Sequence, residues 1–134
     1  MNSNQTPKQV VIAERAPKAI GPYSAGILCQ GFVFVSGQLG IDPENGNLLE
    51  GVEAQARQAL RNLSAVLEAA HTDLNAVVKT TVFLKDMADF AVVNAVYAEF
   101  FTQGFPARSA LQVAALPKGG QVEIEAIAVS PQLS

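Results

Sequence analysis

Two short segments of the chain are apolar at every position, and this limits how the protein can fold. Residues 32–35 (FVFV) and 82–84 (VFL) are typical of β-strands, because both are built from β-branched and other large apolar residues. Alternate residues of a strand point to opposite faces of its sheet, so these segments predict a sheet whose two faces are both covered.

The hydrophobic pattern elsewhere predicts two helices and the remaining strands. Residues 52–70 repeat apolar side chains at helical spacing, and a second helix is expected to follow Asp86 or Asp89 and to run to Phe101. Strands are expected at residues 9–13, 23–30, 32–38, 77–84, 107–115 and 122–129. The order β-β-β-α-β-α-β-β predicts a single α+β domain over residues 1–134, with a flexible tail at residues 1–8.

Two helices can cover only one face of a six-stranded sheet. The doubly apolar strands therefore require another layer on the second face. A second copy of the same chain is the simplest such layer, so the sequence predicts a homo-oligomer.

Composition excludes several classes of function. The net charge is −3 and the pI is near 5.0, so no basic field favours nucleic acid or an anionic membrane. No apolar run has the length of a membrane span, and residues 1–8 lack the apolar segment of a signal peptide, which favours a cytoplasmic protein. With one cysteine, Cys29, and one histidine, His71, neither an intrachain disulfide nor a zinc site of several such ligands is expected.

Charged residues in the C-terminal apolar part are the first candidates for a site. Arg108 is flanked by small residues and follows Pro106, so it either pairs with a surface carboxylate or offers its two-pronged donor to a carboxylate ligand. Glu123 and Glu125 lie on one face of a strand. They form either a solvated face or a site where one carboxylate orients water or moves a proton.

Several polar residues are weaker candidates. Ser36 and Gly37 end an apolar strand, where glycine lets a ligand approach the backbone. Tyr23 follows a Gly-Pro pair and could lend its hydroxyl, and Asn94 interrupts the second helix. Each of these residues has an equally ordinary structural explanation, such as a strand end, a core hydroxyl or a bond to neighbouring backbone.

Seven motifs taken together resemble the RidA (YjgF) family of reactive-intermediate deaminases. The resemblance covers about residues 12–129, and the motifs occur in the family's order. They are AIGPYS at 19–24, SGQ at 36–38, QAR at 55–57, VKTTVFL at 78–84, FPARS at 105–109, LP at 116–117 and VEIEA at 122–126.

The resemblance implies a fold and an assembly. Family members are homotrimers with a chorismate-mutase-like sandwich, a six-stranded mixed sheet with two helices on one face, and clefts between chains as sites. The last strand inserts beside the third, so residues 116–121 would not form a tight hairpin.

The resemblance also implies an activity, the hydrolysis of 2-imino acids such as 2-iminopropanoate and 2-iminobutanoate to 2-oxo acids and ammonia, without a metal or organic cofactor. Arg108 would clamp the substrate carboxylate and Glu123 would position the attacking water. The remaining residues of the expected site are Tyr23, Ser36, Gly37, Asn94 and the backbone of Ala110.

Two departures and three alternatives stay open. Many bacterial members carry cysteine where this chain has Ala110, and the connection at residues 102–104 is short. The alternatives are a ribonuclease, which the acidic balance disfavours, a non-catalytic carboxylate-binding regulator or chaperone, and a deaminase for another imine.

Overall fold

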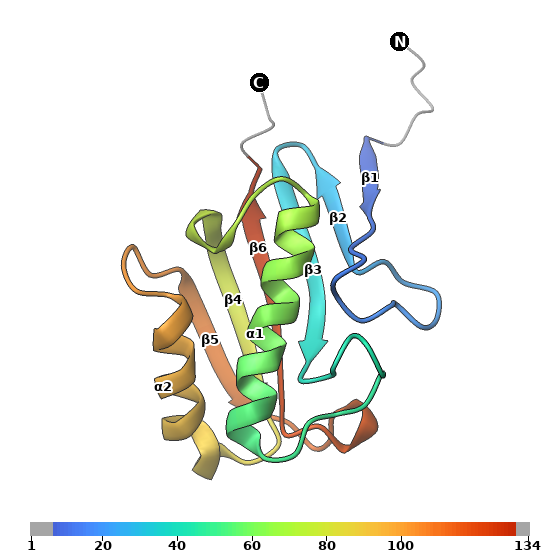
Figure 1. Ribbon diagram of the computed structural model, residues 1–134. Coiled ribbons are helices and arrows are strands. Elements are labelled where there is room, and N and C mark those ends of the chain that lie inside the picture. Colours follow the sequence, from blue (N-terminus) through green and yellow to red (C-terminus); the bar gives the residue numbers. More distant parts are fainter. Residues whose placement is uncertain (1–6, 131–134) are drawn as a thin grey trace.

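The computed structural model describes residues 7–130, which form one mixed sheet and two α-helices (Figure 1). The expected element order is confirmed. Of the tail expected at residues 1–8, residues 1–6 lie outside the described residues, and Lys8 already belongs to the first strand. The elements are β1 Lys8–Val11, β2 Gly26–Cys29, β3 Phe32–Leu39, α1 Val52–Ala69, β4 Val77–Leu84, α2 Phe90–Phe100, β5 Ala107–Gln112 and β6 Val122–Val129.

The strands lie in the order β1-β2-β3-β6-β4-β5. All neighbours are antiparallel except β4 and β5, which are parallel and joined through α2. The hairpin expected between β2 and β3 turns at Gln30 and Gly31, both with positive φ. Because β6 inserts between β3 and β4, β5 and β6 are not a hairpin, as the family resemblance implies.

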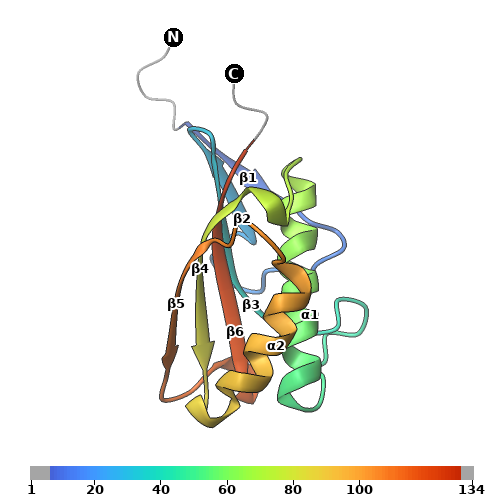
Figure 2. The ribbon, with the colours of Figure 1, turned by 90° about the vertical axis from the view of Figure 1, so that its left-hand side faces the viewer.

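Both helices pack on the same face of the sheet (Figure 2). Leu60, Leu63 and Leu67 of α1 are fully buried there, together with Val82 and Ile124 from the centre of the sheet. A one-turn 3-10 helix leads into α2, and the Asp86 side chain caps that turn by accepting from the Ala88 amide at 2.9 Å. The helical spacing seen in the sequence thus places the core between helices and sheet.

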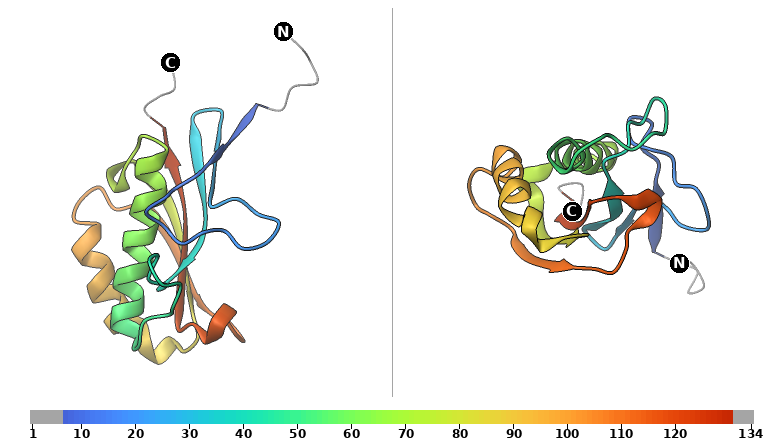
Figure 3. Two further views of the ribbon diagram at one scale, coloured as in Figure 1. Left: turned by 45° about the vertical axis from the view of Figure 1, so that its right-hand side comes forward. Right: turned by 90° about the horizontal axis from the view of Figure 1, so that it is seen from below.

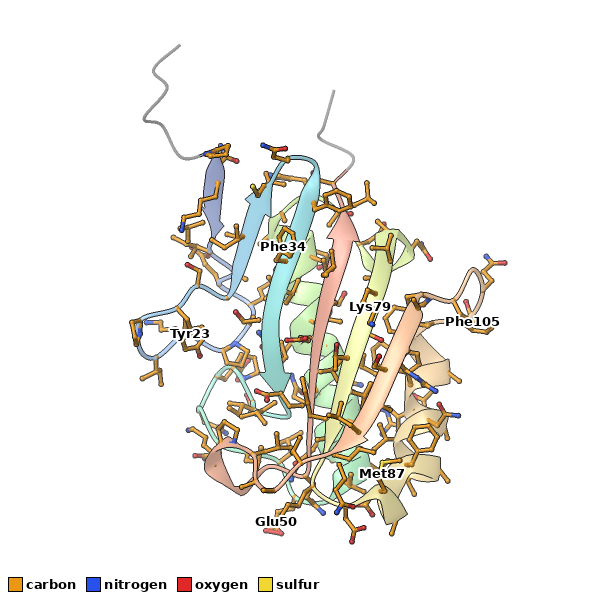
Figure 4. The ribbon with its side chains drawn as sticks, turned by 180° about the vertical axis from the view of Figure 1, so that it is seen from behind. Tyr23, Phe34, Glu50, Lys79, Met87 and Phe105 are labelled. Atoms are coloured by element: carbon orange, nitrogen blue, oxygen red, sulfur yellow. The ribbon has the colours of Figure 1, made fainter. Side chains whose placement is uncertain are left out.

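The opposite face of the sheet, called the open face below, is not covered within residues 7–130 (Figure 4). Val33 and Val35 of β3 are buried beneath the helices, whereas the alternating Phe32 and Phe34 stay 42% and 44% exposed. Val10, Leu111 and Val129 are similarly exposed. The second face therefore carries the apolar surface that the sequence pattern predicts, and a single chain leaves it in solvent.

Among the described residues, no helix combines the length and the apolarity that crossing a membrane would need.

Candidate active site

A pocket of about 850 Å³ lies where β3 ends. Its lining residues come mainly from the loop before β2, the end of β3 with the loop after it, and the turn before β6. The course of these segments can be followed in Figure 3. Tyr23, Ser36, Gly37 and Glu123, four of the residues expected in the site, line this pocket together. Two of its lining residues are joined directly, because Nζ of Lys118 donates to the carbonyl of Gly46 at 3.3 Å.

Gly37 and Glu123 are in unusually close contact. The pairing of β3 with β6 shifts between Val35 and Gln38, which marks a β-bulge around Gly37. A Cβ atom added to Gly37 would lie 2.8 Å from Cδ of Glu123 and 2.9 Å from its Oε2. Glycine at this position is thus what lets the carboxylate lie against the strand backbone.

The Glu123 carboxyl has a perturbed acidity. Burial disfavours its charged form and is the main cause that raises its pKa above the ordinary 4.5, and the negative charge of Glu125 adds to this effect. The carboxylate is therefore a stronger base than an exposed glutamate. A pocket carboxylate with a raised pKa is suited to accept a proton from water.

Ser36 holds the loop before β2 against β3. Its hydroxyl donates to the carbonyl of Ser24 at 2.6 Å, and its backbone N–H donates to the carbonyl of Ala25 at 2.9 Å. These bonds place Tyr23 at the pocket, where its side chain is 55% exposed. In this arrangement the Ser36 hydroxyl has its proton engaged, so it can meet a ligand only as an acceptor.

Arg108 lies in a second cluster, at the edge strand β5 beside α2. Its Nη1 donates to Oδ1 of Asn94 at 2.7 Å, and its Cζ lies 4.8 Å from the ring centroid of Tyr97 and 5.4 Å from that of Phe90. We call Phe90, Asn94 and Tyr97 the arginine platform. The guanidinium is exposed, yet these contacts restrict its orientation. Ala110 follows on the same strand and is partly buried against the core.

The arginine platform is itself anchored in the core. The Tyr97 hydroxyl shares a 2.7 Å hydrogen bond with the hydroxyl of Thr80, which is fully buried on β4. In the sequence, Phe90 and Tyr97 follow the apolar periodicity of this helix, which indicates core residues and gives no sign of a site. Their spacing of seven residues, with Asn94 between them on the same side of α2, is the signal that could have identified the platform.

One chain does not bring the two clusters together. Arg108 lies on β5, at one edge of the sheet, whereas Glu123 lies on β6 beside β3. No described residue of β5 or α2 lines the pocket. Figure 4 shows Tyr23 of the pocket and Phe105, which precedes β5, at opposite sides of the sheet.

Comparison with known families agrees with this architecture. A family model described as Endoribonuclease L-PSP matches residues 13–130. The chain belongs to this family. The Endoribonuclease L-PSP family is the RidA (YjgF) family whose motifs the sequence carries, so the resemblance is confirmed over nearly the whole chain.

Individual members of the Endoribonuclease L-PSP family are similar over almost their full length. The 2-iminobutanoate/2-iminopropanoate deaminase of Bos taurus is 52% identical over 128 residues, which cover 95% of this chain and 93% of the bovine protein. The structure of the YjgF gene product from E. coli has a TM-score of 0.88 at 49% identity, over 90% of this chain and 98% of that one. The structure of E. coli TdcF with bound serine has the same TM-score and coverage at 44% identity.

Proposed function

We propose that the protein hydrolyses small 2-imino acids to 2-oxo acids and ammonia, in sites completed by a second copy of the chain. The observation that carries this proposal is the separation of an oriented arginine on the edge strand β5 from a basic carboxylate on β6, with β4 between the two strands. The names of close relatives support the reaction class, since the bovine protein at 52% identity is a 2-iminobutanoate/2-iminopropanoate deaminase.

Arg108 binds the substrate carboxylate in this proposal. Its Nη1 already donates to Asn94, which leaves the other N–H groups of the planar guanidinium to form a two-pronged contact with a carboxylate. The serine bound to E. coli TdcF is itself an amino acid with a carboxylate, which supports a ligand of this chemistry. The platform holds the guanidinium ready before the substrate arrives.

Glu123 acts as the base. Water attacks the electrophilic carbon of the protonated imine and transfers a proton to the Glu123 carboxylate, which gives a neutral carbinolamine. The carboxyl group then returns that proton to the amino group, and the carbon–nitrogen bond breaks to release ammonia. The hydroxyl group gives its proton to the Glu123 carboxylate as the oxo acid forms, and ammonia takes up that proton to become ammonium. The net reaction consumes one water and needs no oxidant or reductant. The backbone of Gly37 lies beside the Glu123 carboxylate that accepts the proton.

A second copy on the open face would complete each site. The exposed Phe32 and Phe34 lie there as an apolar surface that association would bury. A homotrimer, with the arginine platform of one chain set against the pocket of the next, would form three equivalent sites. Neither cluster then needs to move within its own chain.

Mixing two inactive variants tests this arrangement. When Arg108→Ala and Glu123→Gln chains are coexpressed with different tags in equal amounts, about one quarter of the sites should combine an intact arginine with an intact glutamate. We therefore expect the unfractionated population to regain about one quarter of wild-type imine hydrolysis. Trimers purified through both tags should regain about one third, because each mixed trimer contains one such site out of three.

The control mixes Arg108→Ala chains with the double variant Arg108→Ala/Glu123→Gln, which leaves no intact arginine and should restore nothing. If the first mixture also restores nothing while the mixed oligomers form, the two groups do not meet between chains.

Removing one ring of the platform should weaken substrate binding. Tyr97→Leu loses the aromatic face beneath the guanidinium, whereas Tyr97→Phe keeps the ring and loses only the bond to Thr80. A cation–π contact at an exposed site contributes about 0.5–1 kcal/mol, so we expect KM to rise about twofold to fivefold in Tyr97→Leu. Steady-state kinetics of both variants check this, and an equal KM in Tyr97→Leu and Tyr97→Phe would show that the ring does not hold Arg108.

A further inference from the structure

A buried side-chain amide joins three parts of the chain beneath the pocket. Gln55, in the first turn of α1, is only 3% exposed. Its Nε2 donates to the carbonyl of Leu49 at 2.9 Å and to Oε1 of Gln121 at 3.1 Å, while its Oε1 accepts from the backbone N–H of Gln121 at 2.8 Å. Both N–H bonds and one oxygen acceptor site of the amide are thus used.

The partners of Gln55 lie in two segments of the chain that also contribute residues to the pocket. Leu49 lies near the end of the loop between β3 and α1, and residues 41 and 43–46 of that loop line the pocket. Gln121 immediately precedes β6, two residues before Glu123. Gly40 packs tightly against the same turn of α1, since a Cβ atom there would lie 2.4 Å from Cα of Gln55.

We propose that Gln55 is a positioning residue for the site. Its amide fixes the first residues of β6 relative to the loop after β3, and thereby sets where the Glu123 carboxylate lies in the pocket. Gln55 has no assigned role in the proposed reaction, and its effect on turnover rests on that proposed function. Its effect on the Glu123 carboxyl can be measured without any turnover.

Loss of the Gln55 bonds should alter the surroundings of Glu123. The raised pKa of Glu123 depends first on burial, so a β6 strand that begins more loosely would admit water and lower this pKa toward 4.5. Glu125 on the same strand is the charged group that acts on this carboxyl, and Lys18, Glu44 and Lys118 also line the pocket. None of these four side chains bonds to Gln55, so their charges should act on the Glu123 carboxyl equally in the wild type and in every variant.

Thr72 offers a matched control at the far end of the same strand. It follows α1, is 8% exposed, and its Oγ1 donates to the carbonyl of Val129 at 2.9 Å. Gln55 and Thr72 therefore connect opposite ends of the α1 region to opposite ends of β6. Thr72→Val removes one side-chain bond to the strand without touching the residues near Glu123.

The experiment compares Gln55→Met and Thr72→Val in the full-length protein. The Glu123 carboxyl is titrated by carbon NMR, with the signal assigned from its loss in Glu123→Gln, and kcat and KM are measured with 2-iminobutanoate. We expect Gln55→Met to lower the pKa of Glu123 and to reduce kcat about tenfold, with a smaller change in KM. Thr72→Val should leave the pKa of Glu123 and kcat at wild-type values, although both variants should unfold at a lower temperature than the wild type.

An unchanged Glu123 pKa in Gln55→Met, or an equal change in Thr72→Val, would overturn the proposal. If Gln55→Met does not fold, Gln121→Ala replaces it, because this variant loses only the contact between the two side-chain amides. It should lower the pKa of Glu123 by a smaller amount, and no change would again count against positioning. Absence of turnover in the wild-type protein would refute the proposed function, while the titration still decides the role of Gln55.

Discussion

Replacing Arg108 with alanine is expected to lower kcat/KM for a 2-imino acid by about a hundredfold or more. A charge-assisted bond to a carboxylate contributes about 1.5–3 kcal/mol, and the two-pronged contact also orients the imine carbon toward the attacking water. The measurement generates 2-iminobutanoate in situ with a threonine dehydratase and follows the release of 2-oxobutanoate, while semicarbazide competes for the imine.

Two further variants separate charge from geometry. Arg57→Ala is the matched control, because Arg57 of α1 pairs with Glu99 of α2 at 2.8 Å and belongs to neither cluster. Its kcat/KM should stay within about twofold of wild type. Arg108→Lys keeps the positive charge but loses the planar fork, so its activity should lie between wild type and Arg108→Ala. Wild-type turnover by Arg108→Ala would contradict the carboxylate-binding role.

The fold shows which features a local sequence pattern can predict. The helical spacing of Leu60, Leu63 and Leu67 identifies α1, because one buried stripe follows directly from a single packed face. The neighbours of β6 do not follow from the pattern, since its alternation of apolar and charged residues fits any partner. Pairing between β3 and β6 joins residues about ninety positions apart, such as Val35 and Ala126, and no local signal encodes that register.

The candidate site likewise has features that the sequence predicts and features that only the structure shows. Glu123 and Gly37 can be selected from residue type and strand position, but only the structure shows that the glycine has no room for a side chain beside the carboxylate. Likewise, the sequence pattern does not distinguish Tyr97 from an ordinary core residue. Only the structure shows that its hydroxyl bonds to Thr80 in the core while its ring contacts the guanidinium of Arg108. A pattern assigns a residue to a face, whereas its role depends on neighbours that are distant in the chain.

The open face links folding to function. Strands that are apolar on both faces would be costly to leave in solvent, and the same strands carry the pocket at one end. If association buries this face, then the energy that assembles the oligomer also brings Arg108 of one copy to Glu123 of another. A substitution such as Phe34→Asp on this face should therefore reduce turnover by preventing assembly, without altering either cluster within the chain.

Replacing Glu123 with glutamine is expected to lower kcat by about a hundredfold to ten-thousandfold, with little change in KM. Glutamine has nearly the same shape but cannot take the proton from the attacking water, while Arg108 still binds the substrate. Steady-state kinetics with 2-iminobutanoate measure both parameters, and Arg108→Ala provides a contrast because it should also raise KM. A Glu123→Gln variant with wild-type kcat would show that another group or free water accepts the proton.

The pH dependence gives a second test of the same carboxyl. The base works only when deprotonated, so wild-type kcat/KM should fall as the pH drops through a value above 4.5, the ordinary pKa of glutamate. Glu125→Gln removes the neighbouring negative charge that helps to raise this pKa, and should move the fall in activity to lower pH while keeping kcat at neutral pH.

Stability should respond in the opposite sense to activity. A carboxyl whose pKa is raised in the folded state is protonated more readily there than in the unfolded chain, so its charged form destabilises the fold above the unfolded pKa. Glu123→Gln should therefore unfold at higher denaturant concentration than wild type at neutral pH, and the difference should vanish as the pH falls below about 4.5. A variant that is more stable yet nearly inactive would indicate that the position keeps a partly buried charge for the reaction, at a cost to the stability of the fold.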